Sequence, residues 1–135
     1  TCSEPTPALL SLLAALFDEK VEAVAGDGTF ASFFSLLESP FLYAPHDAVV
    51  PGVLAESDVS DLLGALAPRP VRLEHFVDGV NRRVASSDAA RALDVAVGRY
   101  RAQGAAKHLS LPAAGPGSTG EELTTEQWLL RALKR

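Results

Sequence analysis

Apolar residues recur at helical spacing in several stretches of the chain. Residues 5–17 predict a helix, and we expect it to be largely buried because its leucines and Phe17 cover more than half of the helix circumference. Residues 59–66 predict a second helix, with Asp58 in position to cap its first turn.

The longest predicted helix covers residues 86–103, with Ser86 or Ser87 as its N-cap and Gly104 as its end. Its inward stripe is expected to contain Ala90, Leu93, Val97 and Tyr100.

A last helix should begin at Thr124, because Thr124 and Gln127 have the spacing of a capping box. Three leucines that follow fall three and four residues apart and are expected to share its inward face: Leu129, Leu130 and Leu133.

Three shorter stretches between the helices predict strands at 21–26, 70–77 and 107–111. The middle stretch alternates apolar and polar residues, whereas a strand buried on both faces would be apolar throughout. One face is therefore expected to be wet or paired by charge. Strands that alternate with helices predict an α/β fold, in which a short parallel sheet in this order is the middle of three layers. We expect residues 1–135 to form one domain.

The composition excludes several classes of function. The chain has 135 residues, 47% of them hydrophobic, which is enough for one core. A net charge of −5 and a pI near 5.1 argue against a nucleic-acid partner. No apolar run approaches the roughly 18 residues that span a membrane. The single cysteine, Cys2, excludes an internal disulfide. Both the cytoplasm and the exterior of the cell stay open as compartments.

The chain begins abruptly, with a helix almost at its first residue and no methionine anywhere. The first predicted strand would also have an unpaired edge, and proteins usually cover or extend such edges. We therefore expect the chain to be the back part of a longer polypeptide. Its partner would be the missing N-terminal half or, in the isolated chain, a second copy.

Three segments before the middle strand carry a resemblance to a known family: Val-Pro-Gly-Val-Leu at 50–54, Asp-Val-Ser-Asp-Leu at 58–62 and Ala-Pro-Arg-Pro at 67–70. They resemble the run before the seventh strand of α/β-hydrolase-fold proteins, in particular acetyl xylan esterase-like and dienelactone hydrolase-like members. The likeness extends over nearly the whole chain, which looks like the C-terminal half of that fold. It implies a serine hydrolase acting on carboxylic or carbohydrate esters.

The resemblance also implies two catalytic residues. Ser3 matches the nucleophile of the Gly-x-Ser-x-Gly turn, although Thr1 and Pro5 stand where the family has glycines. Asp78 matches the acid that follows the seventh strand. Each has a structural alternative, since Ser3 is also a typical helix N-cap and an Asp78-Gly79 pair is typical of turns.

The family's histidine should lie in the loop at 112–122, which contains none. His108 falls near the beginning of its strand, about 10–13 Å short of the site. His46 and His75 have no metal-ligand spacing and are interpreted as a solvated loop residue and a hydrogen-bonded strand residue. We expect neither a metal nor another cofactor.

Three functional hypotheses remain. The first is a hydrolase-like segment with a degraded catalytic triad. The second is an active serine esterase or peptidase that uses Ser3 and Asp78 with a histidine not yet placed. The third is a non-catalytic α/β interaction module whose likeness is architectural.

Overall fold

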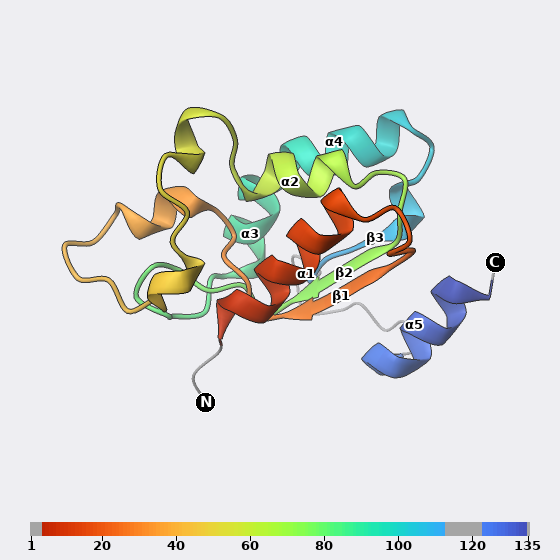
Figure 1. Ribbon diagram of the computed structural model, residues 1–135, viewed down its shortest axis with the longest axis horizontal. Helices are drawn as coiled ribbons and strands as arrows, with labels where there is room; N and C mark the ends of the chain where they lie inside the picture. Colours follow the sequence, from red (N-terminus) through yellow and green to blue (C-terminus); the bar gives the residue numbers. More distant parts are fainter. Residues whose placement is uncertain (1–3, 113–122, 135) are drawn as a thin grey trace.

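The computed structural model describes residues 4–112 and 123–134. Its centre is a three-stranded parallel sheet in the order β1–β2–β3, formed by β1 (Val24–Asp27), β2 (Val71–Glu74) and β3 (Leu109–Ser110) (Figure 1). This confirms the predicted order and the parallel direction. The strands are shorter than predicted, and β2 ends one residue before His75, whose φ of 53° is left-handed and turns the chain out of the strand.

The two faces of β2 differ as its alternation predicted. Val71 and Leu73 are completely buried on one face. Arg72 and Glu74 lie on the other, where the guanidinium and the carboxylate form an ion pair of 2.6 Å. The charge pairing explains how a central strand tolerates two charged residues.

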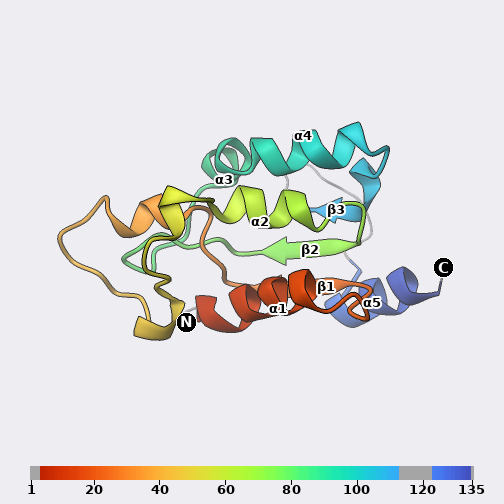
Figure 2. The same cartoon turned by 45° about the horizontal axis from the view of Figure 1, so that its top comes forward.

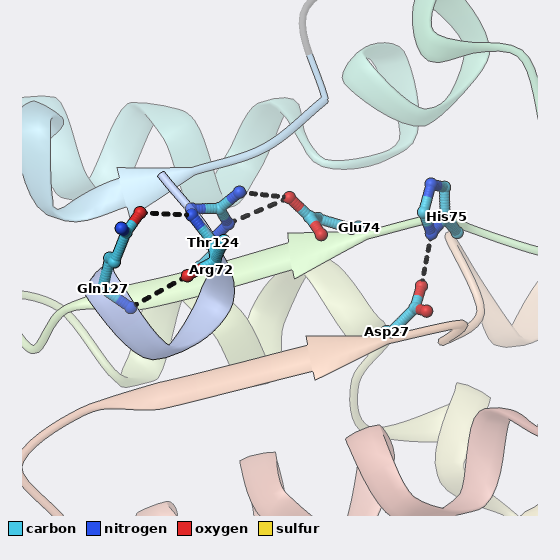
Figure 3. A network of polar contacts seen from close by, with 6 residues as sticks. All are labelled: Asp27, Arg72, Glu74, His75, Thr124 and Gln127. Atoms are coloured by element: carbon cyan, nitrogen blue, oxygen red, sulfur yellow. Dashed lines mark hydrogen bonds and ion pairs between the residues drawn. The ribbon is translucent and has the colours of Figure 1, made fainter. Parts of the chain in front are cut away.

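Helices cover both faces of the sheet. The apolar face carries α1 (Pro5–Phe17), α2 (Val59–Ala65) and α4 (Asp94–Ala102), and Figure 2 shows α4 alongside α2. The charged face carries the start of α5 (Thr125–Leu133), where Figure 3 shows Thr124 and Gln127 beside Arg72. The predicted three-layer α/β fold is therefore confirmed. None of the described helices has the length and apolar character needed to cross a membrane.

The core forms where α1, α2 and α4 meet the apolar face of the sheet. Its largest fully buried side chain is Tyr100 of α4, whose hydroxyl donates a hydrogen bond of 2.7 Å to the Arg69 carbonyl oxygen. Burial raises the pKa of the Tyr100 hydroxyl to about 12, although the Arg69 guanidinium acts in the opposite direction.

Two of the predicted helix caps are confirmed. The Asp58 carboxylate accepts a hydrogen bond from Val59 N at 2.7 Å, and Asp61 accepts one from Asp58 N at 3.1 Å, which completes a capping box for α2. Thr124 and Gln127 form the second capping box, at the start of α5.

The predicted helix over 86–103 is in fact two helices. It is divided at Leu93 into α3 (Ser86–Ala92) and α4, and the N-cap is Ala85 rather than Ser86 or Ser87. Because α4 begins after the break, the backbone N–H of Ala96 lies in its first turn, where it has no partner within the helix. This N–H donates a hydrogen bond of 3.1 Å to the Ser60 hydroxyl of α2. A partner distant in sequence thus stabilises an interruption that no local pattern indicated.

The inward stripe of these two helices is shifted from the prediction. The buried residues are Ala89, Leu93, Ala96 and Tyr100. Ala90 is exposed and Val97 is half-buried, so two of the four predicted positions each move by one residue.

The terminal helices are less buried than predicted. Leu10 and Phe17 of α1 are 57% and 90% exposed. In α5, Leu130 and Leu133 are 60% and 51% exposed whereas Leu129 is half-buried, so the predicted inward face was wrong for two of its three leucines. Trp128 of this helix is half-buried. Helix α5 lies beside the charged face of the sheet, and that face offers little apolar surface against which leucines could pack.

Candidate functional site

The carboxyl ends of the three strands form one edge of the sheet, which we call the carboxyl edge. Helix α1 runs in the direction opposite to the strands, so its first turn lies at the same edge (Figure 1). Ligands of parallel α/β sheets usually bind at this edge, because the loops that follow the strands converge there. Asp78, the position that the resemblance assigned to an acid, follows β2 at this edge.

The most direct chemical pair at the carboxyl edge is Asp27 with His75. The His75 Nδ1 atom lies 2.5 Å from Asp27 Oδ1, and Figure 3 shows the pair joining the ends of β1 and β2. Because an ionised carboxylate only accepts hydrogen bonds, Nδ1 carries the proton, which leaves Nε2 as the acceptor of the neutral ring. A carboxylate that holds a histidine in this tautomer is the arrangement of a general base.

The backbone conformation and the exposure of His75 also fit a functional role. Its backbone is in the left-handed region, which is uncommon for residues other than glycine and occurs often at functional sites. Its side chain is 42% exposed and that of Asp27 71%, so a substrate has access to the ring.

The sequence analysis interpreted His75 as a hydrogen-bonded strand residue and did not identify its partner. Asp27 stands between Gly26 and Gly28, a pattern typical of a turn. The useful signal was the parallel order of the strands, which brings the end of the first strand beside the end of the second.

Asp78 lies in a turn that its own carboxylate stabilises. Oδ1 accepts hydrogen bonds from Val80 N at 3.0 Å and Arg82 N at 2.8 Å, and Oδ2 accepts one from Arg82 Nε at 3.1 Å. The side chain is 22% exposed. A carboxylate used in this way is chiefly a structural element of the turn.

Ser3 lies outside the described residues. The described part of α1 begins after Glu4, and its Thr6 hydroxyl contacts Asp47 Oδ1 at 3.3 Å. Asp47 belongs to a short 3-10 helix, η2 (His46–Ala48), which therefore brings His46 close to the beginning of α1. The exposed position of His46 agrees with a solvated loop residue.

His108 lies at the opposite end of the sheet from the carboxyl edge. It ends the 3-10 helix η4 (Ala106–His108), immediately before β3, and its Nδ1 donates to the Pro68 carbonyl oxygen at 2.7 Å. The prediction that His108 is too far back to replace the missing histidine agrees with this location. The loop at 112–122 falls almost entirely outside the described residues.

The described residues contain no group of three or more histidine, cysteine, aspartate and glutamate side chains placed to hold a metal ion. Comparison with protein-family models, with curated proteins and with solved structures gives no match for this chain.

Proposed function

We propose that the chain is part of an α/β-hydrolase-like domain, related to carboxylic and carbohydrate ester hydrolases, in which the serine triad is degraded. The fold supports this proposal in two ways. The strands follow one another in a parallel sheet, and the last helix lies on the opposite face from the others. That arrangement suits the C-terminal half of such a domain, although other α/β proteins share it.

The bonding of Asp78 carries the argument for degradation. The acid of a triad must accept the Nδ1 proton of a histidine and hold the ring in position. The Asp78 carboxylate already accepts three hydrogen bonds from residues 80–82. The loop expected to supply the histidine, at 112–122, has none in its sequence. Without a base, a serine hydroxyl is a weak nucleophile.

The isolated chain should hydrolyse p-nitrophenyl acetate at close to the background rate. Loss of one triad member typically costs about 10⁴–10⁶ in rate, and this chain lacks the histidine. Turnover is measured for the purified parent chain and for Ser3→Ala and Asp78→Asn. We expect all three rates to agree, because neither residue has a working catalytic partner. A parent clearly faster than both variants would refute the degraded triad.

A second candidate function is an active hydrolase in which His75, oriented by Asp27, is the base. The 2.5 Å contact between Nδ1 and Oδ1 is the observation that favours it. The same assay with His75→Gln and Asp27→Asn separates the two candidates. Activity that falls with His75→Gln and with Ser3→Ala would support this second function, and activity that falls with His75→Gln but not with Ser3→Ala would exclude Ser3 as the nucleophile.

The third hypothesis, a non-catalytic interaction module, draws on the open edge of β1. Val24 N and Gly28 N donate to Pro70 O and Glu74 O, both at 2.9 Å, so the backbone groups of Ala25 between them point away from β2. Helix α1, which packs on β1, exposes Leu10 and Phe17. An unpaired strand edge and exposed apolar side chains on the helix that covers it both favour association.

We expect the isolated chain to self-associate as its concentration rises. Sedimentation velocity measures this directly. Phe17→Glu should shift the distribution towards monomer, whereas Leu54→Glu, at an exposed apolar position outside α1 and β1, should leave it unchanged. A parent chain that sediments as a compact monomer at every concentration would contradict both a missing half and a docking role for this surface.

A further inference from the structure

A pocket of about 300 Å³ lies between α5 and the amino ends of β2 and β3. Pro70 precedes β2, Lys107 and His108 precede β3, and α5 supplies Trp128 and Arg131. Figure 1 shows α5 at the end of the sheet away from the arrowheads. The pocket is therefore separate from the carboxyl edge and from the function proposed above.

The charged groups of the pocket are all basic. Lys107 and Arg131 both line it, and within residues 4–112 and 123–134 neither forms an ion pair with a carboxylate. The chain as a whole carries a net charge of −5. Two exposed cations line one hollow in an acidic protein, and the part of its lining that the structure describes contains no carboxylate, which favours an anionic occupant. A guanidinium is particularly suited to a carboxylate, which it can bind through two parallel hydrogen bonds.

Apart from His108, the remaining described lining is apolar. It consists of the half-buried Trp128 with Pro70, Leu123 and Ala132. The His108 ring is held in place by its hydrogen bond to the Pro68 carbonyl oxygen. An aromatic side chain with adjacent apolar groups provides a surface on which a planar ring stacks. The volume is at the small end of ligand pockets, which limits the occupant to about one ring.

We propose that this pocket binds a small aromatic carboxylate, with the carboxylate between Lys107 and Arg131 and the ring against Trp128. The two cations and the apolar surface each contribute to the binding free energy, and each contribution can be removed separately, by changing the ligand or the side chain. The binding is independent of any ester hydrolysis.

The chain's single tryptophan makes the test direct, because its indole N–H gives one resonance in a ¹H–¹⁵N spectrum. Titration with benzoate should shift this resonance and saturate with a dissociation constant of about 1–10 mM, as expected for a ligand of this size. Benzyl alcohol, which has the same ring without the charge, should bind at least about threefold more weakly. Sodium chloride should weaken benzoate binding and leave benzyl alcohol unaffected.

Arg131→Gln and Lys107→Gln should each weaken benzoate binding about threefold or more, since both side chains are exposed and their loss does not disturb the core. Arg83→Gln is the matched control, because it removes an equal charge from the loop after β2, near the carboxyl edge. The proposal is overturned if benzoate gives no saturable shift, if benzyl alcohol binds equally well, or if the control weakens binding as much as the two pocket variants.

Discussion

Replacing Gly79 with alanine should lower the free energy of unfolding by about 3 kcal/mol or more. Gly79 is buried, and a Cβ atom placed on it would lie 2.5 Å from the Ser35 carbonyl oxygen and 2.8 Å from Leu36 Cα. Both are backbone atoms, so a change of rotamer cannot relieve the overlap. The Gly79 carbonyl also accepts a hydrogen bond from Tyr43 N at 2.9 Å, which any local shift would disturb.

Urea denaturation followed by circular dichroism measures the loss. Gly98→Ala is the matched control, since the Gly98 position in α4 is exposed and has no atom within 4 Å of its added Cβ. Alanine should stabilise that helix by about 0.5–1 kcal/mol. If Gly79→Ala unfolds at the same urea concentration as the parent, the close packing between the turn at 78–83 and the 3-10 helix η1 (Phe33–Leu36) is wrong.

The contact between Gly79 and η1 also indicates the role of Asp78. From its sequence position alone, Asp78 has two equal interpretations, a catalytic acid and a turn residue. The structure favours the second, because the carboxylate fixes the turn that presents Gly79 to η1. Its hydrogen-bond partners could not be read from residue types, since Val80 and Arg82 donate mainly through backbone amides.

Features that depend on local pattern were predicted well. The parallel direction of the strands followed from the alternation of helices and strands, and the caps at Asp58 and Thr124 followed from spacings of three residues. These signals involve neighbours in sequence, where geometry is set by the helix or strand itself.

Features that depend on distant partners were missed. After the break at Leu93, the backbone N–H of Ala96 donates a hydrogen bond to the Ser60 hydroxyl, which is 36 residues away in the sequence. The pair of Asp27 and His75 joins residues 48 positions apart. The exposure of Leu130 follows from the charged face of β2 beneath α5, which its own helical pattern does not encode.

Asp58→Ala should destabilise the chain by about 3 kcal/mol, because one carboxylate connects two elements. Besides capping α2 through Val59 N, it accepts hydrogen bonds from the Ser32 hydroxyl and, at 2.6 Å, from Phe33 N. Loss of an N-cap typically costs about 1 kcal/mol. The remainder comes from the part-buried Ser32 and Phe33 donors, which would lose a charged acceptor.

Asp58→Asn separates these contributions. Asparagine is an effective N-cap, so the loss should be smaller than with alanine, although the charge is gone. Asp94→Ala is the control, because Asp94 lies in the first turn of α4 and is exposed, and its removal should cost about 0.5 kcal/mol or less.

The link between Asp58 and η1 can be measured with a double-mutant cycle that combines Asp58→Ala and Ser32→Ala. Because the Ser32 hydroxyl donates to this carboxylate, the two losses should be less than additive by at least about 0.5 kcal/mol. The same 3-10 helix also packs against Gly79, so it contacts both Asp58 and the turn that contains Asp78. Fully additive losses would mean that Asp58 stabilises α2 alone and does not position the segment beside the carboxyl edge.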